Sequence, residues 1–122
     1  MNATALNDIA TEVHALACSK GWHDDNETED HFIERTCNNM HNEVSELHEA
    51  WRNNQLHMLC DKHEKMTTAG ICPLTCAEEE LADIVIRALD SARRLNIDIG
   101  HAVATKHAFN ATREQRHGGK RS

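Results

Sequence analysis

The most regular pattern in the sequence is AEEELADIVIRALDSARRLN, residues 77–96. Its apolar residues recur at steps of three and four, which is the spacing of one face of an α-helix. They are Leu81, Ile84, Val85, Ala88, Leu89, Ala92 and Leu95. Because this apolar face is almost continuous, the pattern predicts a helix that lies in the core of the protein.

Helical spacing continues on both sides of this stretch. Residues 3–19 have one apolar face, and residues 29–52 have an intermittent one, typical of one long helix or of two with a break. Asp98 is a suitable N-cap for a last helix that ends near Arg113. Residues 54–76 lose the periodicity and contain Gly70 and Pro73, which indicates a connecting loop or a poorly packed insertion. The sequence therefore predicts an all-α chain with four helices.

The size and composition favour a small domain that associates with copies of itself. The 122 residues are enough for one compact domain over residues 1–116, followed by a basic tail at 117–122 without an apolar anchor. Only 3% of the residues are aromatic, so one chain has few large side chains with which to fill a core. We therefore expect self-association.

The charge limits the classes of partner. The chain has 13 Lys and Arg against 20 Asp and Glu, a net charge of -7, which argues against nucleic acid or an anionic membrane as the main partner. No apolar window is long enough to span a membrane, and the amino terminus lacks the features of a secretion signal. We expect a cytoplasmic protein whose cysteines are free thiols.

Carboxylates are spaced three apart at two places in the predicted helices. Glu43, Glu46 and Glu49 follow this spacing in the second helix, and Glu80 and Asp83 follow it in the helix at 77–96, so each set projects from one face. A buried carboxylate without a partner is costly, and hard cations prefer oxygen ligands. The two sets predict a site for Mg²⁺ or Mn²⁺, and the alternative is an acidic stripe in contact with water.

The last predicted helix supplies positive charge. Its polar residues Lys106, Asn110 and Arg113 share one face, and His117 and Lys120 follow shortly after it. Donors of this kind hold phosphate, and next to a metal they would orient a polyphosphate. The alternative is that Lys106 and Arg113 are solvated residues near a helix carboxyl end, where the dipole favours them.

These motifs together resemble the MazG-like all-α nucleoside triphosphate pyrophosphohydrolases, in particular the short members from bacteria, phages and mobile elements. NEVSELHEAWR at 42–52 is similar to the ExxE helix of that family, and EELADIVIRALD at 79–90 is similar to its ExxD helix. The residues from Lys106 to Arg113, with HGGK at 117–120, resemble its phosphate-facing end. KGWHD at 20–24 resembles the segment after the first helix of the family. The resemblance extends from about Val13 to Lys120.

The resemblance implies a four-helix bundle completed by dimerisation, as a homodimer or a dimer of dimers. It implies a nucleoside triphosphate as substrate, cut between the α and β phosphates by a metal-activated water to give the monophosphate and pyrophosphate. The implied Mg²⁺ ligands are Glu43, Glu46, Glu80 and Asp83, and the implied triphosphate contacts are Lys106, Asn110 and Arg113, with His117 and Lys120 beyond them. Trp22 would stack on the base, unless it is a packing residue. Either Glu46 or Glu49 would be the general base.

The two acidic motifs are farther apart here than in the most compact relatives. The extra length contains five residues that can bind zinc: His57, Cys60, His63, Cys72 and Cys76. Their spacing does not match a well-attested zinc finger, so we expect unligated side chains. The competing hypotheses are a regulatory module that binds metal or nucleotide without catalysis, and an interaction protein stabilised by zinc.

Overall fold

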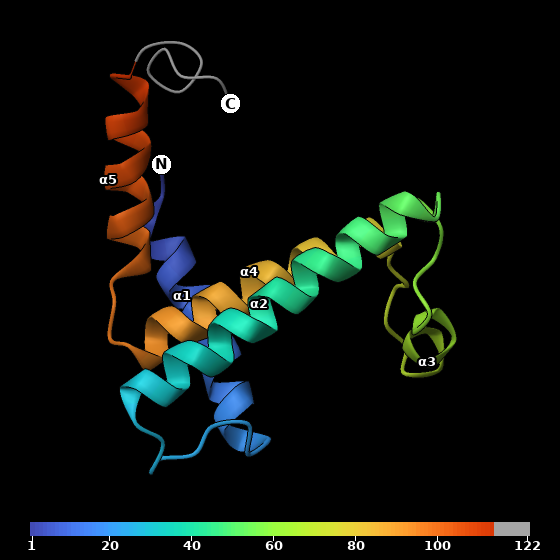
Figure 1. Ribbon diagram of the computed structural model, residues 1–122, viewed down its shortest axis with the longest axis horizontal. Helices are drawn as coiled ribbons and strands as arrows, with labels where there is room; N and C mark the ends of the chain where they lie inside the picture. Colours follow the sequence, from blue (N-terminus) through green and yellow to red (C-terminus); the bar gives the residue numbers. More distant parts are fainter. Residues whose placement is uncertain (114–122) are drawn as a thin grey trace. The chain divides into compact units, whose positions relative to one another are not determined.

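The computed structural model describes residues 1–113 and is helical over most of that range. Five helices follow one another in the described part of the chain (Figure 1): α1 (Ala3–Ser19), α2 (Glu29–Arg52), α3 (His63–Thr68), α4 (Cys76–Arg94) and α5 (Ile99–Ala111). Residues 1–113 contain no strand, only an isolated β-bridge between Leu59 and Thr75. The all-α prediction is confirmed, with one short helix more than the pattern predicted. The predicted tail at 117–122, with His117 and Lys120, lies outside the described residues.

Side-chain caps mark where α1, α2 and α5 begin. The Asn2 side chain accepts a hydrogen bond from the Ala5 amide, and Thr28 does the same for His31 at the start of α2. Asp98 caps α5 by accepting from the His101 amide, as the sequence predicted. This bond, with a second from the Asn7 side chain, lowers the pKa of Asp98. Each cap satisfies an amide that the helix itself leaves without a partner.

The chain divides into two compact units, and the division falls within α4. In the first unit, Met1–Lys20 and the chain from Leu89 onward, α1 packs against α5. Gly100 makes the close approach possible, because a Cβ at that position would overlap the carbonyl of Ala3. The Asn7 side chain joins the two helices: it donates to Asp98 at 2.9 Å and accepts from the Gly100 amide at 2.9 Å.

The second unit, Gly21–Ala88, contains α2, α3 and the first part of α4. In this unit α2 and α4 run side by side, joined by a hydrogen bond from Arg87 to Glu43 (Figure 1). The helix α2 is unbroken, which settles the alternative of two helices. Phe32 and Cys60 are the largest fully buried side chains in the described residues.

The segment between α2 and α4 ends one residue before the predicted end of the loop at 54–76, because Cys76 begins α4, and the segment is not poorly packed. Cys60 is buried, and the amides of Cys60, Cys76 and Ala77 donate to the carbonyls of Leu74, Met58 and Leu56 at 2.8–2.9 Å. The six residues of α3 lie within this loop. A helix this short has too few turns to display an apolar period, so the sequence pattern missed it.

The expectation that α4 lies with its apolar face in the core is wrong for its first half. Leu89 and Ala92 are buried, but Leu81, Val85 and Ile86 are exposed. The reason is that α4 meets α2 through its polar face, because Arg87 binds Glu43 and Glu80 is buried. None of the described helices is long and apolar enough to cross a membrane.

Candidate metal centre

Carboxylates from α2 and α4 converge in the second unit. One ligand oxygen from each of Glu43, Glu46 and Glu80 lies within 4.8 Å of the others, and the same holds for Glu79, Glu80 and Asp83. The steps of three residues in each helix produce this convergence, because they keep the side chains on one face. The predicted metal ligands Glu43, Glu46, Glu80 and Asp83 are therefore brought together, and Glu80 belongs to both groups.

Burial distinguishes this cluster from an ordinary acidic surface. Counted as whole residues, Glu43 is 6% exposed and Glu80 is 9% exposed. The Oε2 atom of each is buried and has no hydrogen-bond partner among the described residues. A buried carboxylate oxygen without a partner is costly, and a cation bound between the helices is one way to offset that cost.

The electrostatics of the cluster disfavour the ionised form of its buried carboxyls. Burial, followed by the neighbouring carboxyls of Glu43 and Glu46, raises the pKa of Glu80 to about 8. Burial also raises the pKa of Asp83, with the charges of Glu43 and Glu79 adding to the effect. A divalent cation among these oxygens would reverse the effect, because it favours the ionised carboxylates.

Two basic residues compensate the cluster in part. Arg87 Nε donates to Glu43 Oε1 at 2.9 Å, and Lys62 Nζ donates to Glu79 Oε1 at 2.8 Å. The bond to Glu79 raises the pKa of Lys62 above its usual range. These partners and Glu79 were missed as site residues by the sequence analysis. Arg87 lies four residues after Asp83, on the same helix face, and this spacing is a signal for it. No periodic pattern marks Lys62, because the loop fold brings it to the site.

The donor set suits a hard cation. Every ligand atom in the two groups is a carboxylate oxygen, and oxygen is the ligand that Mg²⁺ and Mn²⁺ prefer. The unpartnered Oε2 atoms of Glu43 and Glu80 provide free lone pairs for such an ion. The residues therefore fit the cation that the sequence predicted.

A cavity of about 430 Å³ opens beside the carboxylates. Glu46, Glu49, Glu79 and Glu80 line it from the helices, and residues 58–63 line it from the loop. Glu49 is exposed and outside both convergent groups; its nearest polar partners are Asn53 at 3.5 Å and Arg52 at 4.0 Å. Both candidates for the general base, Glu46 and Glu49, thus face this cavity.

The predicted phosphate-binding residues belong to the other unit. Lys106 and Asn110 lie on α5 and line a shallow recess with Val103 and His107, and Arg113 follows the helix in an exposed position. The Lys106 ammonium lies 5.0 Å from the centre of the Phe109 ring. Their approach to the acidic cluster stays a prediction.

The roles expected of Trp22 and of the five possible zinc ligands stay predictions. Trp22 is exposed, so it is not a core residue of this chain, and its role in binding a base stays a prediction. Within residues 1–113, none of the groups of three or more possible metal ligands includes His57, Cys60, His63, Cys72 or Cys76. His63 Nδ1 instead pairs with the carbonyl of Cys60 at 2.8 Å.

No protein-family model, curated protein or solved structure matches this chain. The geometry of α2 and α4 and the sequence motifs they contain are therefore the basis for assigning a function.

Proposed function

We propose that this protein is a Mg²⁺-dependent nucleoside triphosphate pyrophosphohydrolase that cuts between the α and β phosphates. The single observation that carries the proposal is the convergence of Glu43, Glu46 and Glu80 from two helices, with the buried Oε2 atoms of Glu43 and Glu80 unpartnered. A bound cation would offset the free-energy cost of burying these carboxylates. The products are a nucleoside monophosphate and pyrophosphate, and the role is nucleotide house-cleaning or control of the nucleotide pool.

In this proposal Glu43, Glu46, Glu80 and Asp83 hold Mg²⁺, with Mn²⁺ as a substitute. The bound ion supplies charge neutralisation for the phosphates and a more acidic water. Glu49 then acts as the general base, because it lines the same cavity but lies outside the groups of ligand oxygens. Glu46, whose oxygen lies within 4.8 Å of those of Glu43 and Glu80, acts as a ligand. This assigns different roles to two glutamates that the sequence left open.

The substrate contacts remain those of the sequence analysis. Lys106, Asn110 and Arg113 bind the triphosphate, together with His117 and Lys120, and Trp22 stacks on the base. The exposed positions of Lys106, Asn110, Arg113 and Trp22 leave these side chains available for a ligand.

Exposed apolar side chains support a homodimer or a dimer of dimers. Val44 and Trp51 on α2, and Leu81 and Val85 on α4, lie uncovered in the single chain. Neighbouring exposed apolar residues of this kind mark interaction surfaces. A second copy of the chain would cover them and complete a helical bundle.

The test is a Mg²⁺-dependent assay of the full chain against a panel of ribo- and deoxynucleoside triphosphates. Nucleotide products are separated by chromatography, and pyrophosphate is measured directly. We expect monophosphate plus pyrophosphate, with activity lost on chelation and restored by Mg²⁺. Glu34→Gln is the matched control, because Glu34 is an exposed glutamate on α2 outside the cluster, and it should keep full activity.

Other products would change the assignment. Diphosphate plus orthophosphate would keep the metal site but contradict the position of cleavage. Mg²⁺ binding without turnover of any nucleotide would identify a regulatory binding module instead.

A further inference from the structure

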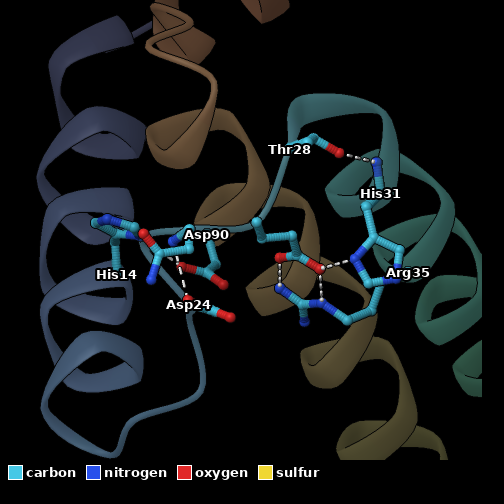
Figure 2. Close-up of polar contacts among 8 residues, drawn as sticks. His14, Asp24, Thr28, His31, Arg35 and Asp90 are labelled. Carbon is cyan, nitrogen blue, oxygen red and sulfur yellow. Dashed lines mark hydrogen bonds and ion pairs between the residues drawn. The ribbon is translucent and has the colours of Figure 1, made fainter.

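A thiol, an imidazole and a carboxylate form a chain of contacts within the first unit. Cys18 Sγ lies 3.5 Å from His14 Nε2, one turn earlier on α1. His14 Nδ1 lies 2.7 Å from Asp90 Oδ1 on α4. Figure 2 shows His14 and Asp90 with their side chains directed toward one another. The order is nucleophile, base and a carboxylate that orients the base.

The short contact with Asp90 favours one tautomer of the His14 ring. A carboxylate only accepts, so the short contact with Asp90 places the imidazole proton on Nδ1. Nε2 is then an acceptor that faces the thiol of Cys18. In this tautomer His14 is ready to take the thiol proton, and Asp90 stabilises the imidazolium that forms.

The thiol is open to reagents while its base is sheltered. Cys18 is exposed, whereas His14 and Asp90 are part-buried. Cys18 is also the residue before Ser19, the last of α1, where the helix dipole opposes negative charge on sulfur. The helix end therefore gives Cys18 no help as a nucleophile, whereas His14 supplies a base in contact with the thiol.

We propose that Cys18 is a site of covalent thiol modification, activated by His14 and Asp90, and that its reagent is a low-molecular-weight disulfide. In the reaction the Cys18 sulfur attacks one sulfur of the disulfide while its proton moves to His14 Nε2. A new bond forms from Cys18 to that sulfur, and the disulfide bond of the reagent breaks. The departing sulfur takes the electron pair and then the proton from His14, which gives a mixed disulfide on Cys18 and one free thiol.

The chain contains its own controls. Cys37 and Cys72 are also exposed free cysteines, but neither has a histidine contact among the interactions found in residues 1–113. Cys60 is buried and serves as a marker of unfolding, because it should react only when the chain opens. Comparison within one molecule removes differences in concentration, temperature and reagent.

The experiment measures the rate of mixed-disulfide formation at each cysteine. The folded full chain is treated with bis(2-hydroxyethyl) disulfide, a neutral reagent that local charge does not attract, and samples are quenched and mapped by mass spectrometry. Rates in the urea-unfolded chain give the intrinsic reactivity of each site. After this normalisation we expect Cys18 to react at least about tenfold faster than Cys37 and Cys72, since a positioned base contributes about a hundredfold or more where it is well aligned.

Two variants separate base catalysis from simple accessibility. His14→Gln and Asp90→Asn should each slow Cys18 to or below the rate of Cys37, with the rates at Cys37 and Cys72 unchanged. Unchanged Cys60 protection verifies that a variant is folded. A normalised Cys18 rate equal to that of Cys37 in the unmodified chain overturns the proposal without any variant. A fast Cys18 that stays fast in a folded His14→Gln chain overturns it as well.

Discussion

Two buried carboxylates in the second unit, Glu27 and Glu43, differ in how their negative charge is compensated. The Glu27 side chain is 6% exposed and that of Glu43 is 8% exposed, so both have lost most of their contact with water. Both oxygens of Glu27 are bound: Arg35 donates to them at 2.8 and 3.0 Å, and His31 lies 3.1 Å from Oε2 (Figure 2). Glu43 has Arg87 on one oxygen, and its other oxygen has no partner in the described residues.

Burial of an acid does not by itself make a metal site. Around Glu27 the fold supplies a guanidinium that matches the carboxylate with two bonds. Around Glu80 it supplies further carboxyls, from Glu43 and Glu46, which raise the pKa of Glu80. The partners of Glu27 balance its charge, whereas around Glu80 we propose that a bound cation does so.

The largest expected effect is on turnover. Glu80→Gln keeps the shape of the side chain but removes the charge shared by both ligand groups. We expect kcat/KM with Mg²⁺ to fall more than about a hundredfold, since loss even of an outer-shell group costs 10–100-fold at many metal sites. Calorimetric titration with Mg²⁺ should show weakened binding in parallel.

Glu27→Gln is the contrasting variant for the same assay. It should keep its Mg²⁺ affinity and its kcat, because Glu27 belongs to neither ligand group. If instead it loses metal binding while Glu80→Gln retains it, the comparison is reversed and the metal centre is assigned to the wrong place.

The next effect is on stability. Here the variant with the large expected loss is Glu27→Gln instead of Glu80→Gln. Glu27→Gln removes the charge that pairs with Arg35, and we expect the free energy of unfolding to drop by about 2 kcal/mol. The loss is below that of a fully buried pair because the Arg35 side chain is 35% exposed and recovers some hydration. Urea unfolding followed by circular dichroism measures it. A change within error would mean that Glu27 and Arg35 contribute specificity of structure but no net stability.

A smaller effect is the pH dependence of stability caused by Glu80. The pKa of Glu80 is raised from 4.5 to about 8 in the folded chain, so the folded state holds this proton more tightly than the unfolded state. Its contribution to stability is present below pH 4.5 and is lost as the pH rises toward 8. Without metal, Glu80→Gln should therefore match the parent near pH 5 and melt several degrees above it at pH 8.5.

Chelator-treated protein and differential scanning calorimetry test this expectation. Subtracting the variant from the parent removes the histidines, which titrate in both. Added Mg²⁺ should stabilise the parent at pH 8.5 and have little effect on Glu80→Gln. Equal stability of the parent and the variant at both pH values would show that ionisation of Glu80 does not destabilise the folded chain.

Local pattern predicted most of the fold, because helix periodicity and caps are local properties. The bounds of α1 and α2 and the cap at Asp98 agree with the sequence analysis. The exposure of Leu81 was not predictable from the sequence. An apolar helix face indicates that the face is buried, but it does not indicate whether the residues that bury it belong to the same chain.

The candidate site was predictable to the same extent as the helices. Glu43, Glu46, Glu80 and Asp83 follow from the spacing within two helices, and only their convergence needed the fold. Lys62 reaches Glu79 from 17 residues away along an irregular loop, so no periodicity indicates it. The contact between His14 and Asp90 spans 76 residues and two helices, and it is a property of tertiary packing alone.

The smallest effect tests whether the two buried carboxylates, Glu27 and Glu43, are independent along α2. Thr28 caps α2 next to Glu27, and its hydroxyl accepts from the His31 amide at 3.2 Å (Figure 2). Thr28→Ala leaves that amide without its cap, and we expect a loss of about 1 kcal/mol in the free energy of unfolding. Glu43 lies fifteen residues, or about four turns, farther along the helix. Turnover and Mg²⁺ affinity should therefore stay at parent values, whereas a matched fall in both would mean that the end of α2 near Glu27 helps to position the ligands near Glu43.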